Sequence, residues 1–482
     1  MRNVLSILLV LLCWAAVSLA VQTSGKIPVT TKSEKAREYF KQGLDLSDKL
    51  RGFDSLAHFK KATEEDPNMA IAFLQVAVNS PSPKEFFENL GKAKSLSKAA
   101  SDGERLWIAA VEAGANARPA QQLETFQKLV ATYPEDERAH MLLGGAYFGL
   151  QEWEKAIVEY NKAIAINPKF SPPYNQMGYA YRFLEKFSES EKAFKKYIEL
   201  IPDDPNPYDS YAELLMRTGR YDESIAQYKK ALSLDPHFLN ASFGIAANYN
   251  FKGDYNAARK ELEAFLKSAR NDGERRATLF AMSVSYASQK DWTNALAQQQ
   301  KAYEIANATN DINAMSGDLF FMGIILLESK KPDEAKEKFD RSAKMIADSK
   351  LSEDMKQNAK RNRLFNLAAV ALAKNDLPAA KKHSGEFAKL AQAAKNRFQI
   401  WQSHEMAGRI AFAEKNYALA ATELSKANVQ NPQNLFRIAQ AHEASGNAAK
   451  AKEMYRKVAE FNSLNSLVYA FVRKEARAKS DL

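Results

Sequence analysis

The chain has 482 residues, of which 46% are hydrophobic and 26% charged, a composition that is ordinary for folded protein and argues against wholesale disorder. Its 19 glycines and 16 prolines are few for this length. That scarcity argues against an all-β fold, because such folds need a turn residue about every ten positions. The net charge of +10 is spread along the chain, and the basic runs are short, such as Arg473, Lys474, Arg477 and Lys479 near the C-terminus. A nucleic-acid partner is therefore not expected.

Residues 1–20 are predicted to be a secretory signal peptide, because a positive charge precedes the apolar run Val4–Val17 and small residues end at Ala20. Cleavage after Ala20 would remove Cys13, the single cysteine, and leave no disulfide or zinc–thiolate site. The alternative is an uncleaved membrane anchor, although the run is shorter than the roughly 20 residues that span a bilayer. We expect a soluble mature protein, secreted or periplasmic, in which the polar residues 21–33 form a linker.

A repeated pattern occupies the chain from residue 34 onward, with degenerate copies in residues 34–134 and four strong copies in residues 135–266. In each strong copy, apolar or small residues recur at steps of three and four, which places them on one face of a helix. Each copy therefore predicts a helix A, a tight turn and a helix B that a proline ends. Four prolines mark a 34-residue period: Pro134, Pro168, Pro202 and Pro236.

Residues 267–465 keep the pattern in divergent form, and we expect longer linkers near residues 268–275, 306–317 and 346–360. Residues 466–482 are predicted to be a capping helix and tail, with apolar residues on one side and charged residues on the other. The chain is thus predicted to be all-α, with about twelve helix–turn–helix repeats.

Two positions of the repeat hold small residues in nine successive copies. With the final proline numbered 32, these are position 8 in helix A and position 20 in helix B. Glycine inside a helix costs about 1 kcal/mol relative to alanine, so it needs a packing reason. We predict that the two helices of a repeat touch at these positions, and that large residues at positions 4, 11, 17 and 24 fill the space around them. The small residues are Gly144, Gly178, Ala212, Ala246, Ser283, Gly323, Ala368, Gly408 and Ala439 at position 8, and Ala156, Ser190, Ser224, Ala258, Ala295, Ala335, Ala380, Ala420 and Ala451 at position 20.

This pattern resembles the tetratricopeptide repeat family. The copy at residues 171–202 shows the resemblance through Tyr174, Gly178, Tyr181, Phe187, Ser190, Phe194 and Pro202. The resemblance implies a right-handed superhelical solenoid whose A helices line a concave groove, and it implies binding of peptide or protein partners in that groove.

In this family, helix A positions 2, 5, 6, 9, 12 and 13 face the groove. Asparagine side chains can hydrogen-bond an extended peptide and arginines can hold carboxylates, although an ordinary solvated face is the alternative. The resemblance therefore implies a binding face made of Asn175, Gln176, Tyr179, Arg182, Asn206, Asp209, Ser210, Glu213, Arg217, Asn240, Phe243 and Asn250. In the later repeats an apolar stripe is either a second site or internal packing. The stripe consists of Phe320, Phe321, Ile324 and Leu327.

The sequence contains no nucleotide-binding glycine motif, zinc-protease motif or serine-hydrolase motif. Two of the six histidines, His140 and His404, fall at position 4 and are interpreted as packing residues. We therefore expect no metal, no cofactor and no catalytic activity. The leading hypothesis is a non-enzymatic scaffold or adaptor of the cell envelope. The alternatives are a solenoid that binds carbohydrate or an anionic cell-wall polymer, and an accessory subunit of an envelope enzyme.

Overall fold

The computed structural model describes residues 25–464 and 466–480, and the predicted signal peptide lies outside these residues. All regular secondary structure in the described part of the chain is helical. The first half contains α1 (Glu34–Asp48), α2 (Gly52–Glu65), α3 (Ala70–Val78), α4 (Pro83–Leu96), the short 3-10 helix η1 (Ser97–Ala99), α5 (Asp102–Ala115), α6 (Pro119–Thr132), α7 (Glu137–Gly149), α8 (Trp153–Ile166), α9 (Pro172–Phe183), α10 (Phe187–Leu200), α11 (Pro205–Arg217), α12 (Tyr221–Leu234), α13 (Leu239–Lys252) and α14 (Tyr255–Ser268).

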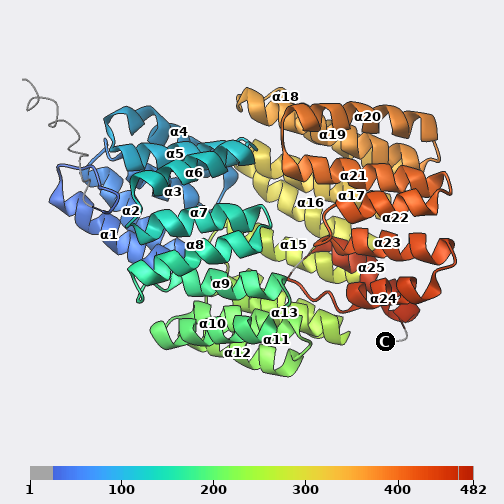
Figure 1. The fold of residues 1–482 in the computed structure, drawn as a ribbon, viewed down its shortest axis with the longest axis horizontal. Helices are drawn as coiled ribbons and strands as arrows, with labels where there is room; N and C mark the ends of the chain where they lie inside the picture. The colour runs from blue at the N-terminus through green and yellow to red at the C-terminus, as the bar shows by residue number, and fades with distance from the viewer. Residues whose placement is uncertain (1–24, 465, 481–482) are drawn as a thin grey trace, which may run out of the picture.

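The second half continues with helices that are mostly longer. They are α15 (Asp272–Ser288), α16 (Trp292–Ala308), α17 (Ile312–Glu328), α18 (Pro332–Ala347), α19 (Glu353–Ala373), α20 (Leu377–Ala393), α21 (Arg397–Ala413), α22 (Tyr417–Lys426), α23 (Pro432–Ala444), α24 (Ala448–Ala459) and α25 (Leu467–Ser480). Helices α1 to α24 pack as successive pairs, each pair against the next (Figure 1). Twelve such pairs confirm the predicted all-helical solenoid and its number of repeats.

The turn between the helices of a pair has a recurring backbone geometry. One residue in it adopts a left-handed conformation, with φ of +59° at Gln151, +57° at Glu185 and +78° at Gly219. A left-handed residue ends a helix because it turns the next backbone N–H back toward the last carbonyls. At Gln151 the following residue, Glu152, donates its N–H to the carbonyl of Tyr147 at 2.9 Å. Helix B therefore starts two residues later, at Trp153, Phe187 and Tyr221 in these three turns, and folds back along helix A.

The prediction for the small residues is confirmed. All eighteen are buried. A Cβ atom added to Gly178 would lie 2.5 Å from the ring of Phe194, the position-24 residue of the same repeat. The Ser190 hydroxyl donates to the Gly178 carbonyl at 2.7 Å, so positions 8 and 20 do touch. The aromatic ring at position 24 therefore occupies the space that a side chain at position 8 would need.

The expected long linkers of the second half are a wrong prediction. The chain between α14 and α15 covers only residues 269–271, and the extra residues lengthen the helices instead. Helices α15, α16 and α17 have 17 residues each and α19 has 21, whereas α8, α10 and α12 have 14. The reason is local, because Asn271, Asp311 and Ser352 lie inside the expected linkers and their side chains cap the next helix.

The solenoid curves so that its second half returns alongside its first half (Figure 1). We call the line of contact the seam. It joins residues 84, 116–118, 151–152 and 216–221 of the first half to residues 311, 352–354, 396–397, 428 and 460–473 of the second. Its contacts include Lys84 with Asp311, Asn116 with Ser352, Ala117 with Asn396, Glu152 with Arg397, and Gln151 with Asn428.

The two ends of the described chain are both tied into the solenoid. Residues 25–33, part of the predicted linker, form no helix, and the N–H groups of Ile27 and Thr30 donate to Asp136 and Glu104 at 2.8 and 2.9 Å. Helix α25, predicted as a cap on the last repeat, packs on α15 as well as on α23 and α24. The ring centroids of Tyr469 and Phe251 are 5.2 Å apart. Helix α25 thus fills space between the central and the final repeats.

Candidate interaction site

The predicted groove residues lie on the inner helices α9, α11 and α13, and most of them are not open to solvent. Five are buried, namely Asn175, Asn206, Asp209, Ser210 and Asn250. Asn206 accepts hydrogen bonds from the Asn175 amide and from the hydroxyl of Tyr197 at 3.3 and 2.9 Å. The structure therefore brings the middle of the predicted face together as an internal polar layer between neighbouring repeats.

A second group of predicted residues forms an ion-pair network across α9 and α11. Arg182 contacts Glu213 at 2.9 Å, and the Tyr179 hydroxyl donates to the other oxygen of Glu213 at 2.9 Å and to Ser210 at 3.2 Å. Burial, reinforced by the negative charge of Glu213, raises the pKa of the Tyr179 hydroxyl well above its usual value. Tyr179 therefore stays protonated and acts as a hydrogen-bond donor that fixes Glu213.

Asp209 is the most constrained member of this inner face. It is only 2% exposed, and its Oδ1 has no hydrogen-bond partner among the described residues. Burial raises the pKa of its carboxyl group well above the usual range, and the nearby Glu213 carboxylate raises it further. Burying a carboxylate without a counter-ion is costly, so burial shifts the ionisation equilibrium of Asp209 toward the neutral acid.

The remaining predicted residues are dispersed. Asn240 is exposed at the start of α13, and Phe243 packs on Phe265 with a centroid distance of 6.3 Å. Gln176 lines a small pocket of about 440 Å³ beside α5, α6 and α7. Asn250 accepts a hydrogen bond from Ser285 at 2.8 Å. These residues do not form one surface with Arg182 and Arg217.

The apolar stripe of the later repeats is used for packing. Phe321 lies 4.8 Å from Phe280 and Phe320 lies 6.0 Å from Phe339 between ring centroids. Ile324 and Leu327 join the apolar clusters of the same helices. Of the two interpretations left open by the sequence, these contacts favour internal packing.

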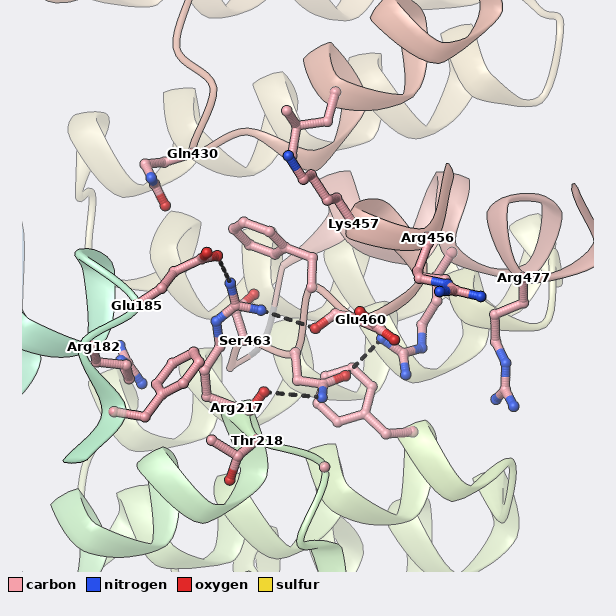
Figure 2. Close-up of a pocket in the computed structure, with 18 of the residues that line it drawn as sticks. Arg182, Glu185, Arg217, Thr218, Gln430, Arg456, Lys457, Glu460, Ser463 and Arg477 are labelled. Atoms are coloured by element: carbon pink, nitrogen blue, oxygen red, sulfur yellow. Dashed lines mark hydrogen bonds and ion pairs between the residues drawn. The ribbon is translucent and has the colours of Figure 1, made fainter. Parts of the chain in front are cut away.

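Arg217 lies at a pocket between the two halves of the described chain. At the C-terminal end of α11 it lines a pocket of about 1230 Å³, which we call the seam pocket (Figure 2). One side of the pocket comes from residues 182–187, 217–221 and 251–252, and the other from residues 429–435 together with α24, α25 and the segment between them. Arg182 also lines it, so the pocket contains two of the predicted residues.

The guanidinium of Arg217 bridges the two sides of the seam pocket. It donates to the backbone carbonyl of Glu460 at 2.9 Å and lies 5.0 Å above the ring of Phe461. Its carboxylate partner, Glu185, is 3.5 Å away and 71% exposed in its side chain (Figure 2). Burial lowers the pKa of Arg217, and the nearby positive charge of Arg182 lowers it further. The charge of Arg217 is thus only loosely compensated.

Five cations of the seam pocket were not among the predicted site residues. They are Lys252 at the end of α13, Arg456 and Lys457 on α24, and Arg473 and Arg477 on α25. The basic run near the C-terminus was visible in the sequence, but its distance from the central repeats along the chain gave no reason to place it beside Arg217. The helix α25 and its position against α15 supply that reason.

The described residues contain neither a cluster of metal-ligating side chains nor a helix that could cross a membrane. In residues 25–464 and 466–480, no group of three histidine, cysteine, aspartate or glutamate side chains could hold a metal ion. Over the same residues, no helix is long and apolar enough to cross a membrane. His140, interpreted as a packing residue, is buried with its Nδ1 2.6 Å from Glu159 and its Nε2 2.9 Å from the Pro134 carbonyl.

The paired helices, the small residues beneath aromatic rings and the regular turns define a helical repeat solenoid of the kind that serves as a protein-interaction scaffold. Models described as TPR repeat or tetratricopeptide repeat match residues 144–184, 171–204, 215–282 and 433–461. The chain is a tetratricopeptide repeat protein. No curated protein matches it.

Solved structures of other repeat proteins resemble parts of the chain. A thermophilic TPR protein of Thermus thermophilus is 24% identical, over 44% of this chain and 98% of the other, with a TM-score of 0.30. A tetratricopeptide repeat protein of Parabacteroides merdae is 16% identical, over 59% of this chain and 98% of the other, with a TM-score of 0.36. YrrB, described as a TPR protein with an unusual peptide-binding site, is 19% identical, over 38% of this chain and 93% of the other, with a TM-score of 0.26.

Proposed function

We propose that the protein is a non-catalytic interaction scaffold of the cell envelope, and that a peptide or protein partner binds in the seam pocket. The observation that carries this proposal is the pocket itself. At about 1230 Å³ it exceeds the roughly 300–1000 Å³ that holds a small molecule, and aromatic and charged side chains line it together. The inner face of the central repeats is a poorer candidate because its polar groups are largely buried or already paired.

The cellular location in this proposal rests on the N-terminal sequence alone. The positive charge, the apolar run and the small residues before position 21 are typical of a secretory signal peptide. A mature protein without cysteine suits an oxidising compartment, because it has no thiol that could form an unwanted disulfide.

A second candidate function is binding of an anionic envelope polymer. The net charge of +10 and the cations of the seam pocket favour it. A role as accessory subunit of an envelope enzyme is compatible with either form of binding, since a repeat solenoid presents its surface to whichever partner fits it.

Site-specific photocrosslinking tests the proposal. A photoreactive amino acid replaces Gln430, which lines the pocket, and in a control replaces Lys229, which is exposed on α12 and does not line it (Figure 2). We expect the pocket position to crosslink a discrete protein in the envelope fraction, and the control position not to. The proposal would be contradicted if the probe at Gln430 crosslinked no protein, or if the chain were found only in the cytosol.

A further inference from the structure

We infer that the seam pocket recognises an acidic peptide segment that also carries apolar side chains; this inference rests on the proposed function and names the chemistry of the partner. Seven of the residues that line the pocket are cationic and three are carboxylates. The cations are Arg182, Arg217, Lys252, Arg456, Lys457, Arg473 and Arg477. The excess of positive charge inside a concave surface favours an anionic ligand.

One arginine that lines the pocket, Arg473, has no carboxylate partner among the described residues. Arg473 donates to Asn462 at 2.8 Å and to the Tyr221 hydroxyl at 3.4 Å, and lies 4.4 Å above the ring of Phe251. All three partners are neutral, and burial lowers the pKa of this guanidinium. Because its partners are neutral, no counter-ion offsets the charge of Arg473. An incoming carboxylate would therefore be stabilised more here than at a cation that is already paired.

The rim of the pocket provides a second pair of charges. Arg456 and Arg477 are exposed and lie on the same side of the pocket (Figure 2). Neither has an ion-pair partner among the described residues. Exposed cations on adjacent helices attract an anionic segment over a distance of about 8–10 Å at moderate salt before it contacts the deeper arginines.

The aromatic side chains decide between a peptide and a purely hydrophilic polyanion. Phe183, Phe187 and Phe461 line the pocket and are partly exposed. Burying such rings against another apolar side chain is favourable, whereas a polymer of charged and hydroxyl groups offers them no apolar partner. A peptide with carboxylates on both sides of one or two apolar residues matches the charges and the rings at once.

The test measures binding of a fluorescein-labelled peptide, Glu-Asp-Glu-Phe-Leu-Asp-Glu-Asp, to the mature chain by fluorescence anisotropy. The matched probe replaces each acid by its amide. The double variant Arg456→Glu with Arg477→Glu reverses the rim charges. The control is Lys229→Glu with Lys260→Glu, because it makes the same change in net charge at exposed residues of α12 and α14 outside the pocket.

We expect the acidic peptide to bind and the amide peptide to bind at least about tenfold more weakly. The rim variant should weaken acidic-peptide binding by about tenfold or more, whereas the control variant should stay within about twofold of the wild type. Replacing both rim arginines by lysine should retain most of the affinity, because the charge is kept. Raising the salt concentration from about 0.05 to about 0.5 M should weaken binding strongly.

Equal binding of the acidic and amide peptides, or equal binding to the rim and control variants, would overturn the inference. Binding of long-chain polyphosphate that depends on the rim arginines, without binding of the acidic peptide, would overturn it in favour of an anionic polymer. If the Gln430 photocrosslink to a protein persists in the rim variant at full yield, the inference fails while the scaffold function stands. If no protein crosslinks to the wild type, the proposed function fails instead.

Discussion

The interior of a repeat and the seam are held together by different kinds of contact. Within a repeat, a small residue such as Gly178 lies directly beneath an aromatic ring, and a buried serine hydroxyl bonds the backbone of the facing helix. Along the seam, loops and helix ends meet through hydrogen bonds and ion pairs such as Glu152 with Arg397. The contacts within a repeat recur from one repeat to the next, whereas the contacts along the seam differ from one position to another.

Helix α25 is the exception along the seam, because it brings an apolar core to one end of it. Tyr469 and Phe471 join one apolar cluster with Met216 and Phe251 of the central repeats and Phe436 of the last repeat. We therefore expect the packing within each repeat to stabilise that repeat, and the return of the second half to depend mainly on α25. Each part of that statement can be tested by substitution.

The largest effect is expected at α25. Phe471 is 5% exposed and its ring centroid lies 5.9 Å from that of Trp292. Phe471→Ala should lower the free energy of unfolding by about 3–5 kcal/mol, because it leaves a cavity between α25 and Trp292 at the start of α16. Urea denaturation followed by circular dichroism measures the loss.

The control for α25 is Leu419→Ala, since Leu419 is 45% exposed and its truncation should cost about 0.5 kcal/mol or less. A loss at Phe471 no larger than that of the control would show that α25 does not hold the halves together.

The next effect is expected inside a repeat. Gly178→Leu should cost about 1–3 kcal/mol or more, because even the Cβ atom would approach the Phe194 ring to 2.5 Å. Gly145 is the matched control, since it lies in α7 with no atom within 4 Å of an added Cβ. Gly145→Leu should be neutral or stabilising.

Thermal denaturation of the two glycine variants measures the difference. Ala156→Leu, at position 20 in helix B of the preceding repeat, should behave like Gly178→Leu. Unchanged melting temperatures at both positions would remove the packing role assigned to the small residues.

The smallest effect is expected for a polar contact of the seam. Arg397 and Glu152 are 2.8 Å apart, and their side chains are 38% and 24% exposed. A double-mutant cycle with Arg397→Ala and Glu152→Ala should give a coupling energy of about 0.2–1 kcal/mol, since solvent screens a partly exposed ion pair. A coupling energy above about 2 kcal/mol would mean that the polar contacts of the seam are not weaker than the contacts inside a repeat.

The sequence was a good guide wherever a contact joins residues of one repeat. Gly178, Ser190 and Phe194 lie within one 34-residue period, so their spacing alone predicted that they touch. The helix lengths of the second half were harder, because a capping residue such as Asn271 can start a helix inside a segment that the period assigns to a linker. The residues of the predicted groove lie on α9, α11 and α13, but the burial of five of them was not foreseen.

The sequence by itself determined the all-helical repeat, the residues at the contact between paired helices and the number of repeats. Local spacing sets these features, because a helix of 3.6 residues per turn fixes which side chains share a face. Only the tertiary structure decided that Asp209 is buried, that α25 lies against α15, and that Arg217 shares a pocket with Arg456 and Arg477. Those features depend on small rotations between successive repeats, which add up over the solenoid and leave no periodic signal in the sequence.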